Sequence, residues 1–168
     1  MTRFMWVLGF ALLLAAGSRF PAAAQVVGDM ELARNWNLRL GLFVPTHESA
    51  RAKEGDVWLN VGAERDVYTM ERGILSMSVE YYGSGSLYNI PIMLNARTES
   101  QRIRLGAGAG VGISHALFRG QTGFAYNFLV GYVVQQGRNP ITADIRYMGL
   151  SVGSGVLDGL SFTLGFHF

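Results

Sequence analysis

The chain has 168 residues, no cysteine, and 14 basic against 12 acidic residues, for a formal net charge of +2. This length is typical of a single domain. The lack of cysteine excludes a disulfide framework, thiol chemistry and cysteine-ligated metal sites. The 22 glycines lie inside apolar alternations and not in linker-like runs, which excludes a disordered chain.

Residues 1–24 have the pattern of a secretory signal peptide. Arg3 supplies the positive charge near the start, and the apolar stretch Met5–Ala16 follows it. Residues 22–24 are all alanine, which matches the small-residue cleavage pattern and places the cut before Gln25. The alternative is a transmembrane helix, but an apolar stretch of about 12 residues is shorter than the roughly 20 that span a bilayer. We therefore expect a cleaved leader.

Cleavage changes the charge of the chain. Arg3 and Arg19 leave with the leader, so 14 basic residues become 12 against 12 acidic ones, and the mature chain is formally neutral. A neutral chain offers no basic surface to nucleic acid, which excludes that class of partner. The mature chain divides into a short N-terminal segment at 25–35 and one patterned domain at 36–168.

The patterned domain alternates between apolar and polar residues with a period of two, as β-strands with unlike faces do. In its first stretch Leu38, Leu40 and Leu42 share one face, while Arg39 and Gly41 share the other. An even number of such segments lets a sheet close with antiparallel neighbours throughout. The eight segments are 36–44, 57–64, 75–82, 88–96, 103–114, 124–133, 141–148 and 160–168.

The two faces of the strands indicate which solvent surrounds them. One face is almost wholly aliphatic and aromatic, and the other mixes Asn, Ser, Thr, Gly and charged residues. A soluble, lipocalin-like barrel would leave the second face outside, where its many glycines and few charges make a poor surface for water. In the opposite arrangement the apolar face meets lipid and the polar face lines a narrow interior. The sequence therefore predicts an all-β fold, a closed antiparallel up-and-down transmembrane β-barrel of eight strands.

The connections should be long on the outer side and short on the periplasmic side. The loop 83–86 and the turn 65–73 break this rule. Pro91 lies inside the fourth segment and has no N–H to donate, so we expect a bulge or a local register adjustment there. With a periplasmic N-terminus, the outer loops are 45–56, 83–86, 116–123 and 149–159, and the periplasmic turns are 65–73, 97–101 and 135–139.

Four stretches carry a resemblance to a known family: Asn89–Leu94, the glycine alternation Gly106–Gly112, Asp144–Tyr147 and the C-terminal Leu164–Phe168. Together they resemble the small outer-membrane β-barrel domain family of Gram-negative-type bacteria, which includes eight-stranded adhesin-like and porin-like surface proteins. The resemblance implies export through the periplasm to the outer membrane, among its lipids. It also implies an assembly signal, read by the barrel-assembly machinery, at Leu164, Phe166 and Phe168.

Charged residues on the predicted inner face form the candidate site. Burying any of them alone would be costly, so they should pair. Arg39 and Glu64 lie toward the periplasmic ends of neighbouring strands, which makes them the preferred pair. We interpret the group as a structural network that plugs the barrel, in preference to a transport or catalytic site. The network is Arg39, Glu64, Glu80, Arg104, Asp144 and Arg146, with Trp58, Phe43, Met93 and Leu129 adding bulk.

Other candidate chemistry is weaker. The glycines of 106–112 lack the following helix that a phosphate-binding loop needs, and they suit close packing inside a narrow barrel. Arg146–Ser151 is similar in placement to the His-x-Ser arrangement of outer-membrane lipid A deacylases, but Gly149 stands where the histidine would be. The histidines are scattered, so we expect no metal or cofactor. They are His47, His115 and His167.

These observations favour a membrane-embedded scaffold with a structural or surface-interaction role. Its first outer loop, 45–56, is the best contact for a surface ligand whose identity the sequence does not give. A small pore for ions or solutes is the alternative function. A lipid A-modifying hydrolase is less favoured, because the general base is missing.

Overall fold

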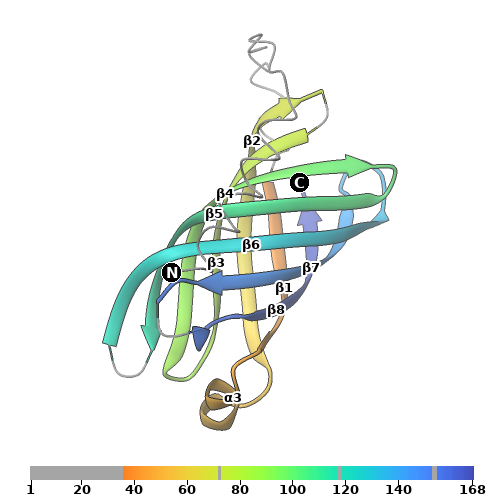
Figure 1. Cartoon of the computed structure of the whole chain (residues 1–168). Helices are drawn as coiled ribbons and strands as arrows, with labels where there is room; N and C mark the ends of the chain where they lie inside the picture. Colours follow the sequence, from red (N-terminus) through yellow and green to blue (C-terminus); the bar gives the residue numbers. More distant parts are fainter. Residues whose placement is uncertain (1–35, 72, 117–118, 153–154) are drawn as a thin grey trace.

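The computed structural model describes residues 36–71, 73–116, 119–152 and 155–168, so the expected leader and the segment 25–35 lie outside it. The described residues form eight strands that close into one barrel (Figure 1). Within these ranges, no helix has the length and apolar character needed to cross a membrane. The strands are β1 (Trp36–Pro45), β2 (Trp58–Met70), β3 (Gly73–Ser84), β4 (Leu87–Ser100), β5 (Ile103–Ala116), β6 (Arg119–Gln135), β7 (Ile141–Leu150) and β8 (Gly159–His167).

Each strand pairs antiparallel with the next, and β1 closes the barrel against β8. At this seam the Trp36 amide donates to the Phe168 carbonyl at 3.3 Å, and the Phe168 amide donates to the Trp36 carbonyl at 3.0 Å. Closure removes the free strand edges that hydrocarbon could not hydrogen-bond. The predicted closed antiparallel barrel of eight strands is confirmed.

The alternation of side chains places the apolar face outside. Leu38, Leu40 and Leu42 expose 48%, 56% and 52% of their surface, whereas Asn37 and Arg39 are buried. An outer surface of half-exposed leucines is poorly suited to water and well suited to hydrocarbon. The apolar side chains of this alternation therefore face lipid, and the polar ones point into the lumen.

The periplasmic turns are shorter than the sequence indicated. Pairing between β2 and β3 continues to Met70 opposite Gly73, so the predicted turn at 65–73 is wrong. The β2–β3 hairpin consequently projects past the neighbouring strands at one end of the barrel (Figure 1). The β4–β5 ladder likewise continues to Ser100 opposite Ile103. Residues 65–73 therefore conform to the rule of short periplasmic connections.

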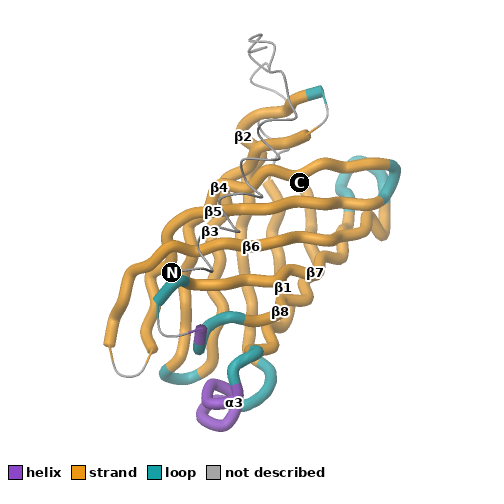
Figure 2. The backbone as a smooth tube through the Cα atoms, viewed as in Figure 1, coloured by secondary structure: helices purple, strands orange, loops and turns teal. Residues whose placement is uncertain are grey.

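The outer end of the barrel carries a helix. The helix α3 (Glu48–Glu54) lies in the first loop, at the opposite end from the β2–β3 hairpin (Figure 2). The sequence predicted only a polar loop at 45–56, because a helix of seven residues is too short to show a hydrophobic period. The third outer loop is shorter than the predicted 116–123, since β6 pairs with β5 from Arg119 onward.

Pro91 is accommodated without a bulge. The register between β3 and β4 is the same on both sides of it, with Val79 opposite Ile92 and Tyr82 opposite Asn89. Only the ladder pairs between these two are missing, and on the other side Pro91 stays in register opposite Gly112. The expected bulge or register adjustment is therefore wrong, because the strand gives up local hydrogen bonds and keeps its alternation.

Candidate functional site

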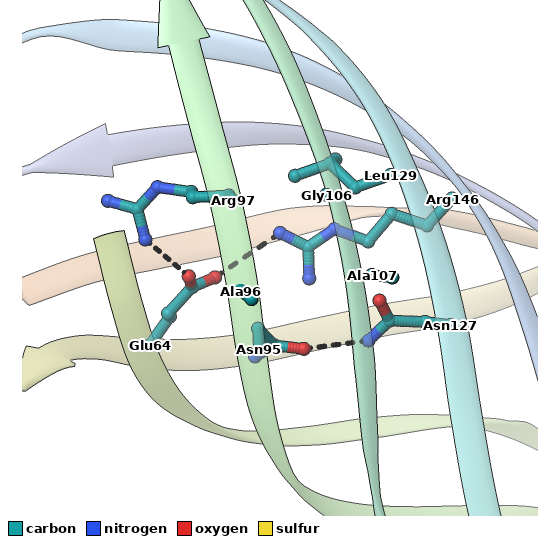
Figure 3. Close-up of a pocket in the computed structure, with 9 residues that line it drawn as sticks. All are labelled: Glu64, Asn95, Ala96, Arg97, Gly106, Ala107, Asn127, Leu129 and Arg146. Carbon is teal, nitrogen blue, oxygen red and sulfur yellow. Dashed lines mark hydrogen bonds and ion pairs between the residues drawn. The ribbon is translucent and has the colours of Figure 1, made fainter. Parts of the chain in front are cut away.

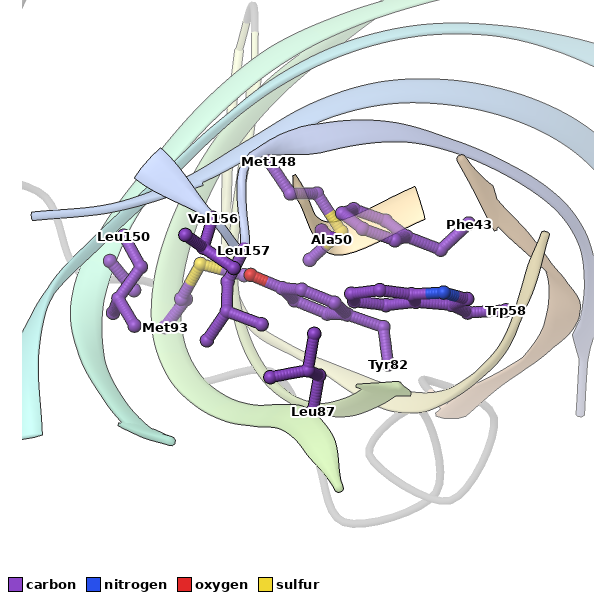
Figure 4. Close-up of a cluster of buried hydrophobic side chains, with 11 residues drawn as sticks. Phe43, Ala50, Trp58, Tyr82, Leu87, Met93, Met148, Leu150, Val156 and Leu157 are labelled. Atoms are coloured by element: carbon purple, nitrogen blue, oxygen red, sulfur yellow. The ribbon is translucent and has the colours of Figure 1, made fainter. Parts of the chain in front are cut away.

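The lumen is apolar toward the α3 end. Phe43 stacks on Tyr82 with ring centroids 4.3 Å apart, and its centroid lies 5.6 Å from that of Trp58 (Figure 4). Side chains from outside the strands join this group, which we call the outer layer. Burial of aromatic and aliphatic groups drives its formation. The outer layer comprises Phe43, Ala50, Trp58, Tyr82, Leu87, Met93, Ala125, Met148, Leu150, Val156 and Leu157.

An outer cap, made of α3 and residues 155–158, closes this end of the barrel. Ala50 of α3 and Leu157 are completely buried in the outer layer. Polar contacts hold the cap to the rim, where the Thr46 amide donates to the Asp158 carbonyl at 2.9 Å. The cap therefore places apolar side chains over this end of the lumen.

The pKa values of two carboxylates in the cap depart from their ordinary values in opposite directions. The Glu54 carboxylate accepts from the Ser86 amide at 3.0 Å and from its hydroxyl at 2.6 Å. These two hydrogen bonds hold the pKa of Glu54 below its ordinary value, and the bond from the hydroxyl has the larger effect. Burial raises the pKa of Asp158 above its ordinary value, although its carboxylate accepts from the Leu150 amide at 2.9 Å. Glu54 therefore favours the charged state in the cap, and Asp158 disfavours it.

The other half of the lumen is charged, and Glu64 is its centre. Arg97 Nη1 donates to Glu64 at 2.7 Å, and Arg146 Nη2 donates to it at 3.3 Å. Figure 3 shows the Glu64 carboxylate lying between these two guanidinium groups. Arg39 pairs with Glu64 as well, and the Ser76 hydroxyl donates to its second oxygen. Glu64 thus contacts three arginines that lie on three different strands.

The remaining predicted residues extend this charged layer across the barrel. Arg39 and Arg146 both pair with Glu80, the latter at 2.6 Å. Arg104 Nη1 contacts both oxygens of Asp144 at 2.8 and 2.9 Å, and Arg146 Nη2 lies 3.4 Å from the same carboxylate. The structure brings all six predicted residues into one connected network, and each is at most 2% exposed.

Three further charges belong to the network and were missed by the sequence reasoning. Arg97 contacts Asp66 through two hydrogen bonds of 2.7 Å and lies 3.1 Å from Glu99. Glu99 also contacts Arg104 at 3.1 Å. These residues had been assigned to turns, but the alternation Asn95, Arg97, Glu99 continues the lumen face of β4. Extending the period of two beyond the apolar positions would have found them.

Between the two layers lies a polar belt of amides. Asn127 Nδ2 donates to Asn95 Oδ1 at 2.9 Å, and we call this contact the amide bridge. It crosses β5 over Gly108, where an added Cβ would collide with both amides. Asn60 donates to Ser161 at 2.7 Å in the same belt. Gly108 thus makes room for neighbouring side chains, as predicted for the glycine alternation, and so does Gly112, where an added Cβ would meet Leu150 and Asn89.

The charged layer leaves almost no open space. A cavity in this layer has a volume of about 10 Å³ (Figure 3). It is lined by Glu64, Asn95, Arg97, Asn127 and Arg146. That volume suffices for about one water molecule. Trp58, Phe43, Met93 and Leu129, which the sequence predicted as lumen bulk, are all buried.

The structure does not bring the candidate hydrolase residues together. The Ser151 hydroxyl accepts a hydrogen bond from the Phe124 amide at 2.9 Å. His115 stacks on Tyr88 on the outer face, and His47 contacts Ser49 beside α3. Among the described residues, no group of three or more His, Cys, Asp or Glu side chains is arranged to hold a metal.

No protein-family model matches the chain, and no curated protein matches its sequence. Among solved structures, it is similar to the backbone structure of the Yersinia pestis outer membrane protein Ail in a phospholipid bilayer nanodisc, with a TM-score of 0.56. The identity is 11%, and the match covers 80% of this chain and 99% of the other. At this identity the likeness concerns the fold alone. The apolar outer surface and polar lumen of a closed barrel are, however, the architecture of outer-membrane proteins, and this chain is an outer-membrane β-barrel.

Proposed function

We propose that the protein is a non-conducting outer-membrane scaffold that presents its outer cap to a partner at the cell surface. The observation that carries this proposal is the filled lumen, with an apolar outer layer stacked on a charged network. An eight-stranded barrel has an interior just wide enough for side chains to fill it. The alternative, a small pore, requires a path through both layers.

The two layers oppose a pore for different physical reasons. A hydrated ion entering the outer layer would have to displace Phe43, Trp58 and Tyr82, which are buried against one another. In the charged layer, an ion would have to break the contacts of Glu64 with its arginines. Breaking a buried pair costs about 3–5 kcal/mol because it leaves a charge uncompensated. Among the described residues, no side chain is placed to offset the cost of displacing the aromatic rings or of breaking the Glu64 contacts.

Conductance tests the non-conducting part of the proposal. The refolded barrel, added to a planar lipid bilayer in molar salt, should give the same current trace as buffer with detergent alone. The barrel population in the sample is verified by circular dichroism before addition. Stable current steps that scale with protein concentration would support the pore instead.

The surface-interaction part rests on the outer cap. Ala50 anchors α3 in the lumen, while Glu48 and Arg51 on the same helix are exposed. A short helix that is fixed from below presents its outer face with little loss of entropy on binding. Cap residues are therefore better contact candidates than a mobile loop of the same charge.

Cells that express the E48A/R51A double variant test this contact without removing the buried anchor. We expect weaker attachment to immobilised host-matrix or cell-surface preparations than for the unchanged chain, at equal outer-membrane levels. The matched control is Glu71→Ala, which removes an exposed charge at the periplasmic end. Unchanged attachment of the double variant would rule out α3 as the contact surface.

We also propose that residues 1–24 direct export and that Leu164, Phe166 and Phe168 direct assembly by the barrel-assembly machinery. The C-terminal alternation and the half-exposed Phe166 and Phe168 side chains support the second point. Intact-mass measurement of the protein from outer membranes should give a chain that begins at Gln25. A mass that includes residues 1–24 would contradict cleavage.

A further inference from the structure

The β2–β3 hairpin is longer than the strand beside it. The described part of β1 begins at Trp36, which lies opposite Arg65 of β2. β2 continues for five more residues, to Met70, and stays paired with β3 as far as Gly73. Figure 1 shows this extension projecting from one end of the barrel. One edge of the hairpin therefore reaches past the described end of β1.

The two sides of the hairpin differ. On the β3 side, β4 accompanies it with Arg97 opposite Ile74. On the β2 side, the ladder with β1 stops at Trp36 in the described chain, and β8 ends at Phe168, which bonds to Trp36 at the seam. We call Asp66–Met70 the β2 edge. Such an edge is a template on which a further strand can pair.

The β2 edge is held in place and suits a strand. At its base, Asp66 accepts two hydrogen bonds of 2.7 Å from Arg97 of the charged network. Val67 is 51% exposed and Thr69 is exposed, and both are residue types that strands favour. A template that is already fixed loses little entropy when another strand pairs with it.

The segment at 31–35 is the chain that reaches this edge first. Asn35 is joined directly to Trp36, so the segment is tethered beside Arg65 without a linker. A tether of this kind gives an effective concentration in the millimolar range, which a separate chain does not match. Five extended residues span about 17 Å, the length of the five-residue edge. No glycine or proline occurs between Gly28 and Trp36 to interrupt a strand.

We propose that residues 31–35 continue β1 and pair antiparallel with the β2 edge. The added strand supplies the hairpin with a neighbour from its own chain. It thereby blocks pairing of the edge with other molecules on the periplasmic side, where the barrel is assembled.

A bulge in β2 fixes the register of the added strand. The β2–β3 ladder shifts between Asp66 and Tyr68, so Val67 is an extra residue there. The added strand has to pass the same extra residue if its side chains are to share faces with those of β2. In that register Ala33 lies opposite Thr69, on the face that continues the lumen side. The side chains of the two residues that flank Ala33 belong to the opposite face.

Engineered cysteine pairs test this register, because the natural chain has no cysteine. The full precursor is expressed in cells, and disulfide formation in isolated outer membranes is followed after an oxidant is added. Thr69→Cys is combined in turn with Ala33→Cys, Leu32→Cys and Arg34→Cys. The pair with Ala33→Cys should oxidise at least about fivefold faster than the other two, since a disulfide needs Cβ atoms about 3.5–4.5 Å apart.

Leu32→Cys and Arg34→Cys are the matched controls, because they flank the predicted position. Similar rates at all three positions would mean that the segment has no fixed register, which overturns the proposal. Dimers linked by Thr69→Cys alone would place a second copy on the edge and overturn it too. The variants are compared at equal outer-membrane levels, with folding verified by mobility on unheated gels.

Hydrogen exchange at the β2 edge supplies a second measurement that needs no cysteine. Deletion of residues 28–34 leaves the expected leader and cleavage residues in place. Alternate amides of the β2 edge should exchange about tenfold faster in the shortened chain, while the amides that bond to β3 should not change. Equal exchange at the edge in the two chains refutes the inference. Residues 31–35 adjoin β1 with or without the leader, so a failure of cleavage before Gln25 leaves this prediction standing.

Discussion

Glu64→Gln is the sharpest perturbation of the charged network. The substitution keeps the size of the side chain but removes the negative charge that contacts Arg39, Arg97 and Arg146. It also places an amide N–H₂ group among donors, where one of the oxygens had accepted. Removing one partner of a buried ion pair costs about 3–5 kcal/mol. Because three guanidinium groups share this carboxylate, we expect a loss at the upper end of that range.

The assay is urea unfolding of the barrel in lipid vesicles, with folded and unfolded chains separated by their different mobility on unheated gels. The matched control is Glu99→Gln, which removes the same charge from a side chain that is 37% exposed and contacts two of the network arginines. Solvent screening limits that loss to about 1 kcal/mol or less. Equal losses for the two variants would refute the argument that burial of the Glu64 carboxylate makes its loss the larger one.

Three further predictions concern other parts of the barrel. Gly108→Ala should break the amide bridge and cost about 1–3 kcal/mol in the same unfolding assay, while Gly120→Ala, with open space around the added methyl, should be neutral. The lowered pKa of Glu54 means that its contact with Ser86 stabilises the cap above about pH 4.3 and is lost as the pH falls through the lower pKa of the folded chain. The protection factor of the Ser86 amide, which is its exchange rate relative to the intrinsic rate at the same pH, should therefore fall as the pH is lowered from 6 through the folded pKa of Glu54. Deleting Phe168 removes two seam hydrogen bonds and should lower the amount of barrel in outer-membrane fractions, which immunoblotting against unchanged total protein measures.

The fold was predictable because a period of two leaves little freedom. Once one residue of a strand is known to face lipid, the alternation assigns a face to all the remaining residues of that strand. Arg39 and Arg146 could therefore be placed in the lumen without knowledge of any contact. The method failed at strand ends. There the lipid-facing positions cease to be apolar, and Arg97 was read as part of a turn although its strand continues to Ser100. Where a strand extends past the hydrocarbon core, its outward side chains are no longer apolar. The strand can then be recognised only from the alternation of its lumen-facing residues.

The outer cap could not have been predicted from the alternation. Val156 and Leu157 are buried in the outer layer, yet they belong to a loop that follows no period. Their burial depends on the space left by lumen side chains such as Tyr82, and that space is a property of the closed barrel. The short helix α3 depends likewise on the pocket that receives Ala50. Tertiary packing, and not local propensity, decides the structure of such segments.

The buried charges call for an explanation other than stability, because well-packed apolar residues often replace a buried ionic network at no loss. Register supplies one. A slip of one residue would turn Arg39, Arg104 or Arg146 toward lipid, where an arginine at the bilayer midplane costs about 2–4 kcal/mol. Leucine would tolerate either face and could not oppose the slip. We infer that the network specifies strand register. A variant with all six predicted network residues replaced by Leu or Gln should therefore refold into several species of different gel mobility. A single species with the mobility of the unchanged barrel would contradict this role.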